Sequence, residues 1–170
     1  MKVGITFGGY CPMHMGHLDL IMKAKKENDV CFVVVCGYDG EERGESIGLT
    51  LNRRYSLVKQ MFKDDEQIKV LKVNDTELGI DESMSESNWD IWLRCVERQI
   101  EKFGQHIGCS TKFTWYVGEE FYVNSLEKRI YDEDLYNEVF CIDKVVYVER
   151  SKNPISATMI RENPIKYWNK

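Results

Sequence analysis

The chain has 170 residues, of which 43% are hydrophobic and 30% are charged, a composition typical of a single globular domain. Lysine and arginine number 23 and aspartate and glutamate number 28, so the formal net charge is −5. This balance argues against a general surface for nucleic acid or for an anionic membrane, because both need clustered positive charge, but it leaves room for small phosphorylated substrates.

Apolar strands alternate with amphipathic helical patterns along the chain. The run 29–37 is almost continuously apolar and β-branched, as are strands that a parallel sheet buries on both faces. In chain order we expect strand 2–8, helix 17–28, strand 29–37, a Gly/Glu-rich loop over 37–48, helix 50–62 with Thr50 as its N-cap, strand 67–74, helix 85–104, strand 112–118, helix 119–130, short strands near 138–148 and helix 156–163.

This order predicts an α/β fold in one domain over residues 1–170. Its core would be a doubly wound parallel sheet with right-handed crossovers, followed by a short C-terminal helical segment. Such sheets bind ligands beyond the carboxyl ends of their strands, at the switch point. The first, second and fourth expected strands end at Gly8, Gly37 and Gly118, so we expect these glycines at the ligand-binding edge.

The six cysteines form no C-x-x-C pair and lie mostly in the apolar strands or helices, so we expect reduced core residues. No apolar run approaches the ~20 residues that cross a bilayer. The first residues, MKVGITFGGY, lack the apolar stretch and cleavage site of a signal peptide. We therefore expect a cytoplasmic protein with neither a membrane nor a nucleic-acid partner.

Two of the three histidines, His14 and His17, stand together in the stretch GGYCPMHMGH, which joins the first expected strand to the first helix. Paired glycines let a ligand approach the backbone closely, and N–H groups in the first turn of a helix favour an anion. Two imidazoles at this point favour an anion cradle over an acid–base pair, because a phosphate nucleophile is already ionised at neutral pH. A helix cap is one alternative. A metal site, for which Asp19 is the only adjacent carboxylate, is a less favoured one.

The segment ISATMIR, residues 155–161, is the second candidate motif. Ser156 is suited to cap a short helix, and Thr158 and Arg161 would project from its first turns. A guanidinium is a fixed fork for phosphate oxygens. Taken alone, the segment favours a capped surface helix with a solvent-facing arginine.

Together the two motifs resemble those of the nucleotidyltransferase superfamily, G-x-F-x-P-x-H-x-G-H and I-S-x-T-x-I-R. The resemblance implies a Rossmann-like nucleotidyltransferase domain that transfers a nucleoside monophosphate from a nucleoside triphosphate to a phosphorylated acceptor. It implies His14, His17 and Arg161 as the catalytic residues. The ATP-binding residues that it implies are Gly8, Gly9, Tyr10, His14, His17, Gly118, Ser156, Thr158 and Arg161.

Most of the chain, least over 119–148, is similar to the NadR-type nicotinamide-nucleotide adenylyltransferases, notably in NWDIW and IRENPIKYW. This resemblance implies transfer of AMP from ATP to nicotinamide mononucleotide (NMN), giving NAD and pyrophosphate, with Mg²⁺ on the triphosphate. An aromatic wall suits the cationic pyridinium ring of NMN. The expected NMN-binding residues are Asn88, Trp89, Trp92 and Arg54, although a core position is the favoured interpretation of Trp92 and a solvated side chain that of Arg54.

The chain departs from the superfamily pattern at three positions. Gly9 replaces Thr, Ser or Lys, so only the backbone is expected to serve there, Tyr10 replaces Phe, and Ala157 replaces a small polar residue. We expect neither the kinase domain of bifunctional NadR proteins nor a helix-turn-helix segment within these 170 residues.

Several alternatives stay open. The acceptor could be nicotinic acid mononucleotide or pantetheine phosphate, and the chain could sense nucleotides without turnover. The sequence leaves a homo-oligomer open as well. A fragment of a class I aminoacyl-tRNA synthetase is disfavoured by the acidic charge and by the missing lysine-rich signature.

Overall fold

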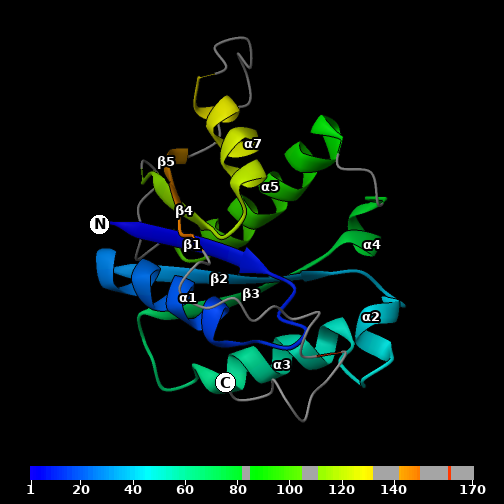
Figure 1. Cartoon of the computed structure of the whole chain (residues 1–170). Helices are drawn as coiled ribbons and strands as arrows, with labels where there is room; N and C mark the ends of the chain where they lie inside the picture. The colour runs from blue at the N-terminus through cyan, green and yellow to red at the C-terminus, as the bar shows by residue number, and fades with distance from the viewer. Residues whose placement is uncertain (82–84, 105–110, 132–141, 150–160, 162–170) are drawn as a thin grey trace.

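The computed structural model describes residues 1–81, 85–104, 111–131, 142–149 and 161, and its centre is a five-stranded sheet (Figure 1). The strands are β1 (Val3–Gly8), β2 (Val30–Gly37), β3 (Ile68–Asn74), β4 (Phe113–Val117) and β5 (Ile142–Tyr147). Their order is β3-β2-β1-β4-β5, and every neighbouring pair is parallel. The predicted doubly wound α/β fold is therefore confirmed.

Helices cover both faces of the sheet (Figure 1). One face carries α1 (Met15–Glu27) and α3 (Leu51–Met61), and the other carries α5 (Glu86–Glu101) and α7 (Glu120–Tyr131). Neighbouring residues of β2 supply the two cores in turn, because successive side chains of a strand point to opposite faces. Phe32 and Val34 pack on the α5 side, whereas Val33 and Val35 pack on the α1 side.

The sheet has its switch point between β1 and β4. The chain adds β2 and β3 on one side of β1 and then returns to add β4 and β5 on the other side. The connections that leave β1 and β4 therefore diverge at the carboxyl edge, which is where open α/β sheets bind ligands. The β1–α1 turn, residues 8–14, lies at this edge and contains the histidine motif.

Within the described residues the predicted elements agree with the structure to within a few residues, β5 is the one strand described where short strands near 138–148 were predicted, and two short helices are additional. Short helix α2 (Glu42–Glu45) stands in the predicted loop, and short helix α4 (Asp75–Leu78) directly follows the predicted strand 67–74, where no element was predicted. Thr50 caps α3 as predicted, because its side chain accepts a hydrogen bond from the Arg53 N–H at 3.2 Å. Of the helix predicted over 156–163, only Arg161 lies within the described residues, and it is helical.

Within the described ranges no helix is long and apolar enough to cross a membrane. Cys11, Cys31, Cys36 and Cys95 are free thiols, and burial raises the pKa of Cys31 to about 12. The remaining two cysteines, at 109 and 141, lie outside the described residues.

Candidate functional site

The β1–α1 turn begins with an unusual backbone conformation. Tyr10 has a φ of 50°, in the left-handed region that side chains with a Cβ rarely adopt. Strain of this kind persists only where the surrounding structure holds it, and such residues gather at binding sites. The Tyr10 ring is buried in the core on the α1 side and meets the His17 ring edge-on, with centroids 4.9 Å apart. The buried Tyr10 ring therefore packs against the His17 ring and restricts its movement.

The side chains of His14 and His17 cap the first helix by accepting hydrogen bonds from backbone N–H groups. His14 is the N-cap residue of α1, and its Nδ1 accepts from the Gly16 N–H at 3.1 Å. His17, three residues on, accepts from the His14 N–H through its own Nδ1 at 3.3 Å. The two rings stack with centroids 3.8 Å apart and an interplanar angle of 22°. The helix-cap alternative is therefore confirmed, and the anion cradle stays a prediction.

This geometry fixes which nitrogen carries the proton. A ring nitrogen that accepts a hydrogen bond has no hydrogen of its own, so both histidines must be neutral and protonated at Nε2. Each imidazole then carries an Nε2–H, a hydrogen-bond donor, and that of His14 is buried. Stacked at 3.8 Å, two neutral rings are also far more compatible than two imidazolium cations.

Gly16 makes the stacked pair possible. A Cβ at this position would lie 2.9 Å from Cε1 and 3.1 Å from Nδ1 of His14. Contacts that short would push the His14 ring away from the N–H group that it accepts from. The glycine between the histidines is therefore required by the ring of the first one.

Arg161 lies against the same turn. Its Nη1 donates to the carbonyl oxygen of Cys11 at 2.6 Å, across 150 residues of sequence. The second motif therefore reaches the loop that carries the first, as the anion-cradle interpretation requires. Ser156 and Thr158 lie outside the described residues, so their predicted contacts with ATP stay predictions.

A second arginine holds the turn from inside the protein. The Arg54 side chain is fully buried, and its Nη1 donates to the Gly9 carbonyl at 3.1 Å while its Nη2 donates to Glu41 Oε2 at 2.5 Å. The other carboxylate oxygen of Glu41 accepts from Arg43 Nε at 2.6 Å. Glu41 is thus the shared partner of one buried and one half-exposed guanidinium.

The burial of Arg54 corrects the sequence interpretation of a solvated surface arginine. Its neighbour Arg53 is exposed, but Arg54 lies on the inward stripe of α3 with Leu51 and Val58. In this conformation Arg54 binds the protein backbone and Glu41 rather than facing the open edge. Its predicted contact with NMN stays untested, and the geometry gives it a role in holding the turn.

Trp89 and Trp92 belong to a cluster of aromatic rings around Phe7, near the end of β1. The centroid distances from Phe7 are 6.3 Å to Trp89, 5.1 Å to Trp92 and 4.9 Å to Tyr122, all edge-on. Both tryptophans are buried, so the core interpretation of Trp92 is confirmed, and Trp89 shares it. The cluster nevertheless lies beneath the ligand-binding edge, beside the β1–α1 turn.

Two contacts fix the start of α5 next to this cluster. Asn88 donates to Asp81 Oδ1 at 3.0 Å, and Asp90 accepts from Arg129 of α7 at 2.9 Å. The segment NWDIW therefore couples α5 to α7 while it supplies two rings to the cluster. Gly118, which directly follows β4, lies at the same edge as the end of β1.

The acidic groups near the site offer little to a resident metal ion. No group of three or more His, Cys, Asp or Glu side chains within the described ranges could hold one. Glu41 is bound to two arginines. Burial and, next, the charge of Glu41 raise the pKa of Asp75 to about 6, and its Oδ1 is buried with no hydrogen-bond partner among the described residues.

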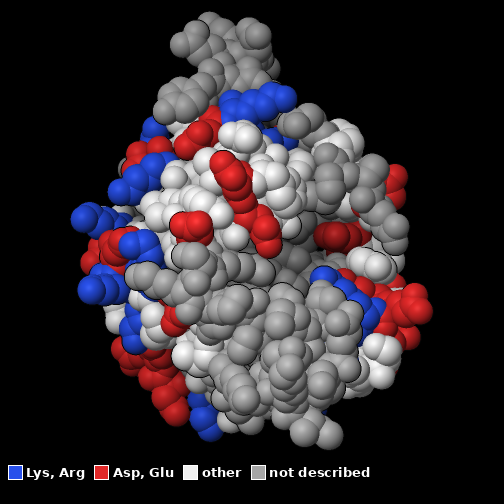
Figure 2. Space-filling model, in the orientation of Figure 1, with Lys and Arg blue, Asp and Glu red and all other residues white. Residues whose placement is uncertain are grey.

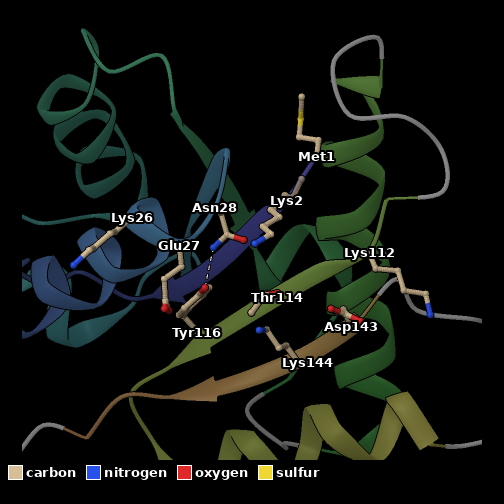
Figure 3. Close-up of a pocket in the computed structure, with 11 residues that line it drawn as sticks. Met1, Lys2, Lys26, Glu27, Asn28, Lys112, Thr114, Tyr116, Asp143 and Lys144 are labelled. Carbon is tan, nitrogen blue, oxygen red and sulfur yellow. Dashed lines mark hydrogen bonds between the residues drawn. The ribbon is translucent and has the colours of Figure 1, made fainter.

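A large cavity lies at the other end of the sheet (Figure 3). It measures about 610 Å³, and Figure 3 shows Asn28 and Tyr116 hydrogen-bonded at 2.8 Å in its wall. The lining includes Lys2, Lys26, Lys112, Lys144, Glu27 and Asp143. Because it adjoins the amino end of β1, it is separate from the histidine edge, and parallel sheets bind substrates at their carboxyl ends. We therefore place the functional site at the β1–α1 turn.

The surface charge agrees with the composition. Figure 2 shows acidic and basic side chains interspersed around the visible face, with no broad area of one sign among its coloured atoms. Near the β1–α1 turn, the guanidinium groups of Arg54 and Arg161 each donate to a backbone carbonyl of the turn, and that of Arg54 is neutralised by Glu41.

Sequence reasoning missed Glu41 and Arg43, because the stretch between β2 and α3 read as a loop. A signal for Arg54 was present: in helical spacing it falls on one face with Leu51 and Val58, so it could have been assigned to the buried side.

Comparisons with known proteins agree with this geometry. A family model described as cytidylyltransferase-like matches residues 5–163. The trifunctional NAD biosynthesis/regulator protein NadR of Salmonella typhimurium is 29% identical over 175 residues, which cover 98% of this chain and 38% of NadR. The protein of the same name from Escherichia coli is 28% identical, again over 98% of this chain and 38% of NadR. The chain therefore spans well under half the length of these curated relatives.

Solved structures give the same result. A NadR protein in complex with NAD and AMP-PNP is 31% identical with a TM-score of 0.73, and the match covers 98% of this chain and 43% of that one. A NadR protein in complex with NR is 32% identical with a TM-score of 0.76, covering 98% and 42%. A bifunctional NMN adenylyltransferase/ADP ribose pyrophosphatase from Francisella tularensis, 13% identical with a TM-score of 0.65 over 95% of this chain and 41% of that one, shares the fold.

The raised pKa of Asp75 predicts a pH-dependent stability. The unfolded chain releases this proton near pH 3.9, whereas the folded protein holds it to about pH 6. The ionised group therefore costs the fold stability as pH rises from 4 through 6. We expect Asp75→Asn to raise the urea midpoint at pH 7.5 and to raise it much less at pH 4.5. An equal gain at both pH values, with Asp64→Asn as the exposed control, would contradict the raised pKa.

Proposed function

Because the chain belongs to the cytidylyltransferase-like family, we propose that it transfers AMP from ATP to NMN, giving NAD and pyrophosphate. NadR proteins, to which it is similar over nearly its whole length, are named for NAD biosynthesis, and one was solved with NAD and AMP-PNP. The observation that carries the proposal is that both motifs meet at one turn, with Arg161 bound to Cys11 between the end of β1 and His14.

The reaction needs donors of hydrogen bonds more than it needs a base. An ionised phosphate oxygen of NMN would attack the α-phosphorus of ATP, and the bond from that phosphorus to the bridging oxygen would break. The bond's electron pair would go to the pyrophosphate leaving group. Only interactions that strengthen as this charge develops accelerate the step. The Nε2–H groups of His14 and His17 suit this task, because both donate a hydrogen bond without giving up a proton.

Arg161 would act on the same charge from its position at the Cys11 carbonyl. Its guanidinium carries a permanent charge and several N–H donors in fixed geometry, which suits the β- and γ-phosphates of the leaving group. A bound polyphosphate would compete with the Cys11 carbonyl for these donors. In-line phosphoryl chemistry depends on positioning and electrostatics in this way.

Magnesium would enter with the nucleotide. Mg²⁺ is commonly bound through substrate phosphates with only one or two carboxylates. The described residues near the turn fit this mode better than a dedicated site, because Glu41 is already bound by two arginines. The ion would neutralise part of the triphosphate's charge and orient its oxygens.

The aromatic cluster supports NMN as the acceptor. A pyridinium ring is a cation with a π face, and Trp89 stands in the first turns of α5, beneath the ligand-binding edge. Asn88 precedes it and offers an amide to the carboxamide of the base. Binding at Trp89 would require the ring to exchange an edge-on contact with Phe7 or Tyr122 for the substrate.

The activity is tested by measuring pyrophosphate release with ATP and a panel of acceptors. We expect turnover with NMN and weaker or absent turnover with pantetheine phosphate. The ratio of turnover with NMN to turnover with nicotinic acid mononucleotide measures how strongly the site prefers a carboxamide to a carboxylate. Preferred use of pantetheine phosphate would replace the acceptor in the proposal. Tight binding of ATP and NMN without pyrophosphate release would instead indicate a nucleotide sensor.

A substitution at His14 separates its capping role from its catalytic role. Asparagine is a good N-cap and keeps an acceptor for the Gly16 N–H, but it has no counterpart to Nε2–H. We expect His14→Asn to lower kcat by ~10²–10³ while the urea midpoint stays close to that of the wild type. His14→Ala, which removes cap and donor together, should lower both. If His14→Asn retains full kcat, the imidazole serves the helix alone.

Arg161 is expected to affect the nucleotide more than the acceptor. Arg161→Ala removes the fork proposed for the β- and γ-phosphates, so the KM for ATP should rise ~10-fold or more, with a smaller change for NMN. Arg161→Lys should recover only part of the loss, because an ammonium lacks the planar fork. Separate titrations with ATP and NMN measure this directly, and a larger effect on NMN than on ATP would contradict the assignment.

A further inference from the structure

The Glu41 carboxylate stands behind the β1–α1 turn as a bridge between two arginines of different character. Arg54 is fully buried and reaches the Gly9 carbonyl, whereas the Arg43 side chain is 45% exposed. One carboxylate therefore forms ion pairs with a guanidinium inside the protein and with one at its surface. Both cations border the same residue, Gly9.

Two glycines make room for this arrangement. A Cβ at Gly37, at the end of β2, would lie 2.5 Å from Arg54 Nη2 and 2.8 Å from Glu41 Oε2. A Cβ at Gly9 would lie 2.7 Å from Arg43 Nη2. The space that side chains would occupy at positions 9 and 37 is thus filled by guanidinium and carboxylate groups. Gly9 is also one of the positions at which the chain departs from the superfamily pattern. The Arg43 guanidinium lies where a side chain at this position would begin.

Stability alone is a weak reason for a buried ion pair at this place. Removing a carboxylate and a guanidinium from water costs much of what their attraction returns, and apolar residues of similar volume often serve a fold as well. The ion pair instead fixes the positions of the groups around it, because Arg54 binds both Glu41 and the Gly9 carbonyl with directed hydrogen bonds. Position is therefore the property to test.

Resting on the adenylyl transfer proposed above, we propose that Glu41 is a positioning residue for the site. Through Arg54 it fixes the Gly9 carbonyl and with it the turn that ends at His14. Through Arg43, whose side chain is partly exposed, it holds a guanidinium beside Gly9, where that group would meet an anionic ligand bound at the turn. Within the described residues, Nε is the only atom of the Arg43 guanidinium that donates a hydrogen bond, so its Nη groups are available to that anion.

The first test compares the variants Glu41→Gln and Glu42→Gln, since Glu42 is the exposed neighbour of Glu41 on α2. Their KM and their kcat per folded molecule are measured. We expect Glu41→Gln to lower kcat ~10–100-fold with a smaller change in KM for NMN, because misplaced donors weaken the transition state. Glu42→Gln should match the wild type. A merely structural Glu41 would lower the urea midpoint and leave kcat per folded molecule unchanged, which would overturn the proposal.

The second test needs no turnover. The chain has three histidines, so their imidazole C–H signals are readily resolved by NMR. Glu41→Gln should shift or broaden the signals of His14 and His17, and Glu42→Gln should leave them in place. Unmoved signals in Glu41→Gln would overturn the proposal.

This second readout also separates the two proposals. A wild-type protein without pyrophosphate release would contradict the adenylyl transfer, while the imidazole signals would still decide the role of Glu41. If Glu41→Gln does not fold, Glu41→Asp takes its place in both tests. It keeps the charge but draws the carboxylate back by one methylene from both arginines.

Discussion

The site depends on how one short piece of backbone, the β1–α1 turn, is held. Its carbonyl oxygens at Gly9 and Cys11 accept hydrogen bonds from two guanidinium groups, those of Arg54 and Arg161. Within the turn, Tyr10 occupies a left-handed conformation and is buried against His17. A strained residue between two hydrogen-bonded carbonyls fixes the backbone of the turn. Preorganised donors stabilise a transition state only if the backbone that carries them does not move.

The side chains of the two histidines are held in place by hydrogen bonds as well. In most proteins a helix start is capped by a hydroxyl, a carboxylate or an amide, and here two imidazoles do the same task for α1. By accepting at Nδ1, both rings are committed to the neutral form with the proton at Nε2. One set of hydrogen bonds therefore stabilises the helix and sets the chemical state of the site. On the proposed function, an acidic chain would bind a polyphosphate here through a few oriented donors and Arg161.

Much of this was predictable from sequence, for physical reasons. Strands such as 29–37 are apolar throughout because both faces of a parallel sheet are buried, and β2 is found there. The place of His17 in the first turn of a helix followed from the strand–helix order. The Glu41 bridge did not follow, because it depends on how α2 folds back over a glycine at position 9. For Trp89 and Trp92, spacing places both on one side of α5, but only the position of Phe7 at the end of β1 shows that they share a packed cluster.

The central claim is that the two ends of the chain act on the same polyphosphate. A crystal structure with AMP-PNP and Mg²⁺ tests this most directly. We expect Nε2 of His14, Nε2 of His17 and the guanidinium of Arg161 to lie ~3 Å from oxygens of the one bound triphosphate. A triphosphate bound away from the β1–α1 turn, or one that contacts the imidazoles while Arg161 remains on the Cys11 carbonyl, would contradict the account.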